Sequence, residues 1–390
     1  MTARAILPGA TIGILGGGQL GRMTAMAART LGYDVHALDP DPECAARAVV
    51  DRLVTARFDD AEAAADLARH CDVVTLEIEQ IATASLDAAG RHARVRPSSK
   101  LLGIVQDRAR QKRWLVDAGF PVGPYEEVSD TVAVQRAATK LGPLVVKATR
   151  GGYDGRSQVR VATASDADAA WTSLIDPRAA NRQAVAEQAL DLASELSVMI
   201  ARSPRGDIAV YPPALNFHER QVLSWSVIPA ALPAMLVRQA TELAANIAGA
   251  LELEGLLAVE MFLTTRDELL VNELAPRPHN SFHETELACP TSQFEQLVRA
   301  VCNLPLGDTS IVRPAAIVNL FGDLWHEGTT PHFDAALAEP LTRLHLYGKR
   351  VARPGRKMGH ISALGDTPEK ALARARAAAA RLTSDAGAAE

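Results

Sequence analysis

The sequence predicts a mixed α/β protein of several domains that begins with a parallel sheet. Three observations carry this prediction. The chain has 390 residues, which is more than one compact core usually holds. Short apolar segments alternate with amphipathic ones over the first hundred residues, as in β-α-β units. Two apolar segments at 256–263 and 268–273 are separated by only a few residues, which indicates an antiparallel pair.

The first part of the chain supplies the parallel sheet. Its expected strands are short, apolar and closed by turn residues, and its expected helices carry apolar residues at helical spacing. We expect strands at 11–15, 34–38 and 72–76, and helices at 19–31 and 61–70. The Arg96-Pro97-Ser98-Ser99 stretch is a natural boundary to a second domain.

The second part mixes strands of both orientations with longer helices. A helix over 107–118 ends at Gly119, ahead of Pro121. Further strands are expected at 144–148, 184–189, 195–201 and 221–227, and a long helix at 233–251. The tail from Ala315 ends in a helix that Thr367 caps, with Pro368 in its first turn.

Composition narrows the class of protein. With 41 basic and 46 acidic residues, the formal charge is −5. The chain therefore lacks the excess of basic residues that is typical of a nucleic-acid binder. The longest apolar stretch, 227–237, holds two prolines and is too short to span a bilayer. The start of the chain does not read as a signal peptide. Cys44, Cys71, Cys289 and Cys302 lack metal-site or redox spacing, so we expect reduced thiols in a cytoplasm.

The first glycine motif, Gly16 to Gly21, fits G-x-G-x-x-G between a strand and a helix. Glycines there let the backbone approach a phosphate at the helix N-terminus. Asp39 ends the second strand, where a ribose-binding acid would lie. Taken alone, this segment leaves an NAD-dependent dehydrogenase open, although many α/β domains use the same turn for other phosphates.

A second glycine-rich loop follows Lys147. This lysine ends an apolar strand, and Gly151, Gly152 and Gly155 come within eight residues. The loop is not a Walker motif, which needs Gly-Lys-Ser/Thr opening a helix. A lysine before a flexible glycine loop indicates phosphates held by an ammonium and covered by a hairpin. An exposed turn with a solvated lysine is the alternative.

Two carboxylates, Glu260 and Glu273, lie inside apolar strands, where an unpartnered acid is costly to bury. If the strands are neighbours, both acids can hold a Mg²⁺ ion whose coordination phosphate oxygens complete. Two edge acids facing water are the alternative. Arg277 follows, and its guanidinium could bind an anion beside the metal. His279 and His283 are as consistent with structural hydrogen bonding as with catalysis.

A late basic cluster combines Tyr347-Gly348-Lys349 with Arg356-Lys357-Met358-Gly359-His360. Such a run is usually a solvated surface. An anion site is also plausible here, because the rest of the chain is acidic.

The combination of motifs resembles the N5-carboxyaminoimidazole ribonucleotide synthetases, biotin-independent ATP-grasp carboxylases of purine synthesis. The resemblance covers about residues 11–363. The motifs that carry it are Gly16-Gly17-Gly18-Gln19-Leu20-Gly21-Arg22-Met23, Thr75-Leu76-Glu77-Ile78-Glu79, Gln106-Asp107-Arg108, Gly151-Gly152-Tyr153-Asp154-Gly155-Arg156, Asn272-Glu273-Leu274-Ala275-Pro276-Arg277 and Gly355-Arg356-Lys357-Met358-Gly359-His360.

The resemblance implies an ATP-grasp fold in three parts: a Rossmann-like domain over 1–97, an ATP-grasp domain over 98–314 with a lid at about 120–190, and a small C-terminal domain over 315–390. It implies ATP and magnesium as cofactors, and 5-aminoimidazole ribonucleotide and bicarbonate as substrates. ATP would phosphorylate bicarbonate to carboxyphosphate, and the substrate amine would then be carboxylated. A cytoplasmic homodimer with no nucleic-acid or membrane partner is expected.

The resemblance also implies a role for particular residues. Aminoimidazole ribonucleotide would contact Gln19, Leu20, Glu77, Tyr153, Asp154, Arg156, Lys349, Arg356 and Lys357. ATP would contact Arg108, Lys147, the lid loop Gly152, Tyr153, Asp154, Gly155, Arg156, Ser157 and Gln158, the hinge Glu187, Gln188, Ala189 and Leu190, and also Glu195, His218, Asn272 and Glu273. Glu260 and Glu273 would bind magnesium. Tyr153, Asp154, Arg277 and Lys349 would be catalytic.

The chain departs from the family pattern at four positions. Phe282 replaces a glycine, Glu284 an aromatic residue, Ser157 a glycine and Leu215 a glutamate. Phe282 replaces a residue with greater conformational freedom, so it puts the local geometry near His283 in question. These departures leave open a nucleotide-binding relative without turnover. Another ATP-grasp ligase, such as a biotin carboxylase or a formate-using transformylase, is a separate alternative.

Overall fold

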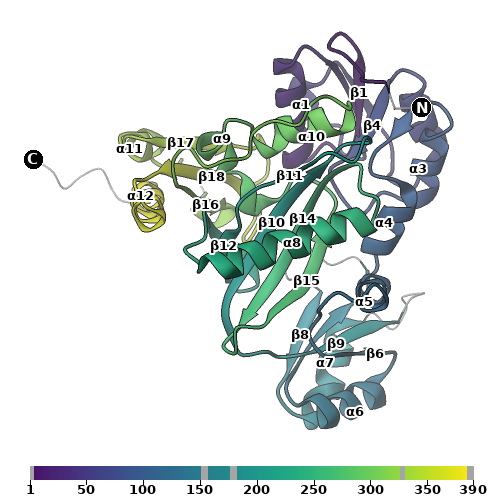
Figure 1. The fold of residues 1–390 in the computed structure, drawn as a ribbon, viewed down its shortest axis with the longest axis vertical. Helices are drawn as coiled ribbons and strands as arrows, with labels where there is room; N and C mark the ends of the chain where they lie inside the picture. The colour runs from purple at the N-terminus through teal and green to yellow at the C-terminus, as the bar shows by residue number, and fades with distance from the viewer. Residues whose placement is uncertain (1–3, 151–156, 176–181, 326–329, 384–390) are drawn as a thin grey trace, which may run out of the picture.

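The computed structural model describes residues 4–150, 157–175, 182–325 and 330–383 (Figure 1). It contains three sheets, and the chain passes through them roughly in order, from the N-terminal sheet to a small sheet and then to a large central one.

The N-terminal part is a five-stranded parallel sheet with strand order β3-β2-β1-β4-β5. Its strands are β1 (Thr11–Leu15), β2 (Asp34–Asp39), β3 (Arg52–Thr55), β4 (Val73–Leu76) and β5 (Arg94–Val95). The helices of this part are α1 (Gln19–Thr30), α2 (Ala61–Ala68), α3 (Thr83–Ala89) and α4 (Ser99–Val105). Four of the five residues of β1 and all of β4 are buried, because helices cover the apolar strands of a parallel sheet on both faces.

A small four-stranded antiparallel sheet lies at the opposite end of the molecule (Figure 1), with strand order β6-β9-β7-β8. It contains β6 (Tyr125–Val128), β7 (Leu144–Ala148), β8 (Gln158–Val161) and β9 (Ala184–Gln188), covered by α6 (Thr131–Leu141) and α7 (Ala167–Leu174). These residues bury their own apolar core, centred on Val146 and Trp171. Helix α5 (Arg108–Asp117) leads into this sheet, and the Asp107 carboxylate caps its N-terminus.

The central sheet has nine strands in the order β15-β14-β10-β12-β13-β16-β18-β17, with β11 paired to β10. Its first strands are β10 (Leu192–Arg202), β11 (Ile208–Val210), β12 (Ala214–Glu219), β13 (Val222–Ile228), β14 (Gly255–Thr264) and β15 (Leu269–Ala275). Helices α8 (Ala234–Ala250), α9 (Thr285–Ala288) and α10 (Gln293–Val301) belong to this part. The β14–β15 hairpin places Glu260 directly opposite Glu273, so the expected antiparallel pairing is confirmed.

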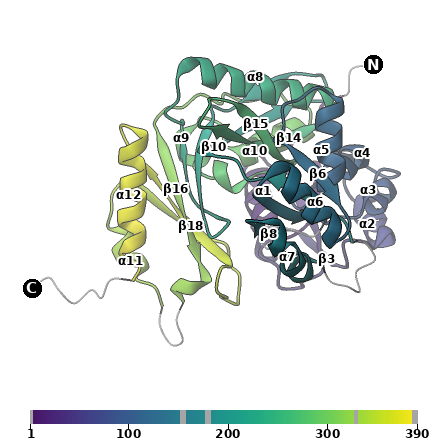
Figure 2. The same cartoon turned by 90° about the horizontal axis from the view of Figure 1, so that it is seen from below.

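The C-terminal residues extend the same sheet with β16 (Ala315–Phe321), β17 (Thr342–Leu346) and β18 (Lys357–Leu364). Helix α11 (Phe333–Leu337) and helix α12 (Pro368–Ala380) pack beside these strands (Figure 2). The Thr367 side chain accepts a hydrogen bond from the Lys370 N–H, which confirms the expected cap. Short 3₁₀ turns are Arg47–Val49, Ala164–Asp166, Asn280–Phe282 and Gly322–Leu324.

No helix in the described part of the chain combines the length and the apolar character that a membrane span requires.

Candidate active site

A cavity of about 1090 Å³ lies where the three parts of the chain meet. The glycine turn after β1 and the end of β4 contribute one wall, strands β7 to β9 a second, and the central sheet a third. The predicted site residues that line it are Gln19, Leu20, Glu77, Arg108, Lys147, Gln158, Glu187, Gln188, Ala189, Leu190, Glu195, His218, Glu260, Asn272, Glu273, Arg277, Lys349 and Lys357. Residues spread over more than 300 positions therefore converge on one cavity.

A few predicted residues are not part of this set. Gly152, Tyr153, Asp154, Gly155 and Arg156 lie outside the described residues. Ser157 is described, but it is not among the cavity-lining residues, and its carbonyl accepts the Ala148 N–H. Arg356 is also absent from the lining, and its guanidinium donates to the Val351 carbonyl.

The first glycine turn binds an internal carboxylate. The Gly18 and Gly21 N–H groups donate to the two oxygens of Glu77, at 2.8 and 2.9 Å. A Cβ atom at Gly18 would lie 2.6 Å from that carboxylate, so the turn needs glycine there. The N–H groups that would hold a dinucleotide pyrophosphate are thus already occupied.

Asp39 has a structural role in the same turn. Its carboxylate accepts the Gly17 N–H at 2.7 Å and the Asp41 N–H at 2.8 Å, and it does not line the cavity. The position that suggested a ribose-binding acid therefore supports the turn, and the case for a dinucleotide enzyme loses both of its observations.

A cluster of opposite charges forms the deep end of the cavity. The Lys147 ammonium lies 3.1 Å from Glu187 and 3.2 Å from the Asn272 side-chain oxygen. Lys112, which the sequence did not single out, lies 3.4 Å from the same Glu187 carboxylate. Burial alone would raise the pKa of Glu187, but these cations outweigh it and lower the pKa to about 2. Glu187 is therefore ionised at neutral pH.

Each of the paired acids of the β14–β15 hairpin has a basic side chain as its partner. Glu273 accepts a hydrogen bond from Arg108 at 2.6 Å. Glu260 lies 3.0 Å from the His279 ring Nε2, and the Asn272 amide donates to it at 3.3 Å. Burial opposes ionisation of Glu260, but His279 and further cations outweigh burial and lower its pKa. Both acids face the cavity, as a set of oxygen donors suited to a hard divalent cation.

The residues expected to contact the nucleoside are also adjacent. Glu195 lies 2.8 Å from the His218 ring, on the neighbouring strand. Burial lowers the pKa of His218, but the Glu195 hydrogen bond and charge outweigh it, so the net shift is upward. Close by, the hinge residues 187–190 leave the end of β9.

A chain of polar side chains crosses the opposite end of the cavity. The Lys349 ammonium donates to the Gln19 side-chain oxygen at 2.6 Å, and the Gln19 amide donates to Asn280 at 2.9 Å. The same Asn280 oxygen lies 2.9 Å from His283 Nε2. Burial holds the pKa of His283 well below its usual value, so this ring is neutral and donates its Nε2 proton to Asn280.

Arg277 lies between the two ends of the cavity. Its guanidinium pairs with Glu79 at 2.7 Å, and both residues line the cavity. The sequence prediction singled out Arg277 as an anion ligand but gave no role to Glu79 or Asn280. Glu79 belongs to the Thr75–Glu79 motif, and Asn280 lies within the Pro276–His283 stretch, so each could have been found as a partner of a residue already chosen.

Phe282 takes the place of the family's glycine without a positive φ. Phe282 lies in a 3₁₀ turn, is fully buried and packs against Tyr211, with ring centroids 6.1 Å apart. It is not among the residues with positive φ. The site therefore does not require the conformational freedom of glycine at this position.

Glu284, another departure from the family pattern, is fully buried in the structure. Its Oε1 accepts a hydrogen bond from Ser226 at 3.2 Å, and burial raises its pKa well above the usual value. A carboxyl group whose pKa is raised on folding stabilises the fold at low pH, and this contribution is lost as pH rises from the unfolded-state pKa through the folded-state value. The Tm of the protein should therefore fall with rising pH partly because of Glu284.

The variant Glu284→Gln tests this, because a neutral amide replaces a neutral carboxyl group. Between pH 5 and pH 8 its Tm should fall less than that of the wild type, by a few degrees. Glu219→Gln, at an exposed position, is the control and should follow the wild type. The measurement is calorimetry at both pH values, and parallel curves for Glu284→Gln and wild type would contradict the assignment.

Comparison with known proteins assigns each part of the chain. The family model for the ribonucleotide synthetase preATP-grasp domain matches residues 9–106, and the ATP-grasp domain model matches residues 113–294. The model for the phosphoribosylaminoimidazole carboxylase C-terminal domain matches residues 315–374.

Relatives match over nearly the whole length. The chain is 41% identical to N5-carboxyaminoimidazole ribonucleotide synthase of Bacillus subtilis, over 93% of each chain. It is 39% identical to the synthase of Brucella melitensis, over 93% of this chain and 98% of the relative. Among solved structures, an ADP complex of N5-carboxyaminoimidazole ribonucleotide synthetase matches at 41% identity and a TM-score of 0.88, over 96% of this chain and 98% of the other. The Aspergillus clavatus synthase with ADP and 5-aminoimidazole ribonucleotide matches at 31% identity and a TM-score of 0.87, with the same coverage.

Proposed function

Because this chain belongs to the N5-carboxyaminoimidazole ribonucleotide synthase family, we propose that its cavity carboxylates 5-aminoimidazole ribonucleotide at the expense of ATP. The products are N5-carboxyaminoimidazole ribonucleotide, ADP and phosphate, within purine biosynthesis. The observation that carries the proposal is the convergence of acidic and basic side chains on one cavity that all three matched regions line; among them are Glu260, Glu273, Lys147, Lys349 and Arg277.

The deep end of the cavity is the proposed ATP site. Lys147 and Arg108 offer cations to the phosphates, and the hinge residues 187–190 accept the adenine. Glu195 and His218 lie where a ribose hydroxyl would find an acceptor beside a donor. Glu187 holds Lys147 and Lys112 in place before ATP arrives, so that little ordering is needed on binding.

Glu260 and Glu273 would hold a magnesium ion. Their oxygens face the same cavity from opposite strands, and Mg²⁺ commonly combines one or two carboxylates with substrate phosphates. When bound, the ion offsets charge on the transferring phosphoryl group. Arg108 must then release Glu273 or share it, which places a guanidinium next to the phosphates.

The other end of the cavity is the proposed ribonucleotide site. An oxygen of bicarbonate attacks the γ-phosphorus of ATP and ADP departs, leaving carboxyphosphate. The exocyclic amine then forms a bond to the carboxyl carbon of carboxyphosphate as the bond from that carbon to the phosphate oxygen breaks, or to carbon dioxide after phosphate has left. In either case the departing phosphate can take up the amine proton. Lys349 and Arg277 are the described cations that can orient the carboxyl group at this step. Asp154 and Tyr153 are proposed to share in this work, and the family's closing loop would exclude water from the intermediate.

Two finer points complete the proposal. We propose that the carbon source is bicarbonate, and that the enzyme acts as a cytoplasmic homodimer. The basis for the homodimer is the family resemblance, and gel filtration with light scattering tests it directly.

The decisive activity measurement is ADP formation with 5-aminoimidazole ribonucleotide and bicarbonate, each omitted in turn. We expect ADP release that depends on the ribonucleotide, and no product when formate replaces bicarbonate. ADP formation with formate would indicate a transformylase. ATP binding without any turnover would indicate a relative that has lost catalysis. A parallel titration that shows saturable NADH binding would contradict the structural role of Glu77.

The polar chain gives a further prediction about substrate binding. Because Gln19 links Lys349 to Asn280, the variant Asn280→Ala should leave the lysine less well oriented. We expect the KM for 5-aminoimidazole ribonucleotide to rise about 10-fold, with the KM for ATP changed by less than about twofold. Gln19→Ala should reproduce this pattern. Asn246→Ala, at an exposed helical position, is the control. An equal rise in both KM values would contradict a role confined to the ribonucleotide end.

A further inference from the structure

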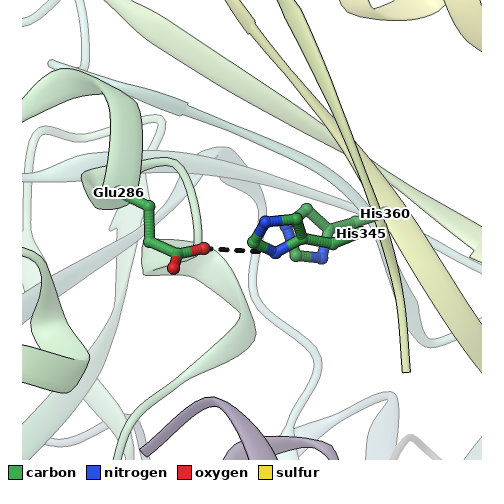
Figure 3. Close-up of side chains that lie close together, drawn as sticks. All are labelled: Glu286, His345 and His360. Atoms are coloured by element: carbon green, nitrogen blue, oxygen red, sulfur yellow. Dashed lines mark ion pairs between the residues drawn. The ribbon is translucent and has the colours of Figure 1, made fainter. Parts of the chain in front are cut away.

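A second cluster of ligand-type side chains lies outside the cavity, between α9 and the C-terminal strands. Glu286 comes from α9, His345 from β17 and His360 from β18 (Figure 3). The Glu286 Oε2 atom lies 3.2 Å from His345 Nδ1. One ligand atom from each of the three residues lies within 4.8 Å of the others, and none of the three residues lines the cavity.

The His360 Nε2 atom is buried and has no hydrogen-bond partner among the described residues. Glu286 Oε2 is also buried, and its ion-pair contact is with His345 Nδ1. Buried polar atoms in folded proteins are nearly always hydrogen-bonded, so an unpartnered His360 Nε2 needs an explanation. His360 is fully buried, so bulk water is not a ready partner for its ring.

The Tyr347 hydroxyl orients the His360 ring. It lies 2.8 Å from Nδ1, on the far side of the ring from the unpartnered nitrogen. When Nδ1 carries the proton and donates to this hydroxyl oxygen, Nε2 presents a lone pair that can bind a cation. A second hydrogen bond of this kind commonly fixes the tautomer of a metal-binding histidine.

The chemistry of the set is that of a transition-metal site. Two imidazole nitrogens and one carboxylate oxygen are ligands of zinc, iron and related ions, whereas magnesium prefers oxygen alone. Zinc bonds of about 2.0–2.2 Å place ligand atoms about 3–4 Å apart, so a small rotation of these side chains would suffice.

The geometry points to a binding site for a zinc-class divalent ion formed by Glu286, His345 and His360. The site is separate from the proposed magnesium site, and it would link α9 to the C-terminal strands β17 and β18. Glu286 and His345 are each about one-quarter exposed, which provides an entry path and room for a water ligand. The nearby Arg343 guanidinium opposes the cation, so we expect micromolar rather than nanomolar affinity.

Cobalt(II) is a suitable probe, because its visible absorption reports nitrogen and oxygen ligands in a site of this type. Tag-free protein, dialysed against a chelator, should bind one equivalent with a saturable band that zinc abolishes. Glu286→Gln and His345→Gln should each weaken cobalt binding about 100-fold or more, because each removes a direct ligand and loss of an outer-shell partner alone costs 10- to 100-fold. Circular dichroism shows whether each variant folds. If one of the two variants does not fold, the other still tests the site.

Glu273→Gln is the matched control, since it alters the magnesium site and leaves this cluster intact. It should bind cobalt as the wild type does. The inference is overturned if the wild type shows no saturable band, if both cluster variants bind as the wild type does, or if Glu273→Gln alone abolishes binding. In any of these cases Glu286 and His345 are a hydrogen-bonded pair that shares a proton.

Discussion

Replacing Glu273 with Gln should lower turnover about 1000-fold and leave the fold in place. The substitution keeps a side-chain oxygen that can accept from Arg108 but removes the negative charge that would hold a divalent ion opposite Glu260. Loss of one preorganised electrostatic contact to a transferring phosphoryl group commonly costs two to three powers of ten. The effect should fall on kcat more than on the KM for the ribonucleotide, because other residues form the proposed ribonucleotide site.

The experiment compares steady-state ADP release with Glu268→Gln as the control. Glu268 lies on the same hairpin, but its side chain is about half exposed and points to solvent. The control should keep nearly full activity, and the Tm of both variants should lie within a few degrees of the wild type. Activity of Glu273→Gln within tenfold of the wild type would remove this residue from the metal site.

The second large effect is expected for Lys147→Met, which keeps the apolar stem and removes the ammonium. Lys147 is the buried cation at the end of β7, between Glu187 and Asn272. Without it, we expect kcat/KM for ATP to fall about 100- to 1000-fold, because a desolvated charge–phosphate contact is lost. Glu187 keeps Lys112 at 3.4 Å, so its own charge is not left unpaired.

Lys140→Met is the matched control for this prediction. Lys140 is exposed on α6 and pairs with Glu126 at the surface, where such pairs contribute little. Binding of ATP, followed by calorimetry, should weaken for Lys147→Met and not for Lys140→Met. Equal ATP affinity in the wild type and Lys147→Met would show that other cationic side chains bind the ATP phosphates.

Local sequence patterns were sufficient for the elements that form the site. Apolar runs closed by turn residues located β1, β7 and the β14–β15 hairpin. The register shift between Glu260 and Met261, which places Glu260 opposite Glu273, is visible only in the structure. Thr367 and Pro368 located the start of α12, and Gly119 and Pro121 located the end of α5. These features depend on neighbours in the chain, which a sequence displays directly.

Features that depend on distant partners could not be derived in the same way. The glycine turn appeared to suit a phosphate, and only the fold shows that Glu77, more than fifty residues away, occupies its N–H groups. Lys112 looked like an ordinary helical lysine, but it is buried against Glu187, which lies on strand β9. Phe282 looked disruptive because the sequence did not show the space beside Tyr211 that accepts it.

The three-part domain division remains a prediction. The sequence placed a boundary at 314/315, and the C-terminal strands β16 to β18 continue the central sheet through the β13–β16 pairing. Strand order across a sheet is set by long-range pairing, on which a local pattern gives little information. We retain the three-part division as a proposal, to be tested by limited proteolysis.

The measurement that most directly tests this account is a crystal structure with ADP and Mn²⁺, with the metal located by its anomalous scattering. We expect the manganese peak between the Glu260 and Glu273 carboxylates, in contact with an ADP phosphate oxygen, and Lys147 within hydrogen-bonding distance of the phosphates. A peak elsewhere, or ADP bound against the Gly16–Gly21 turn with both acids uninvolved, would contradict it.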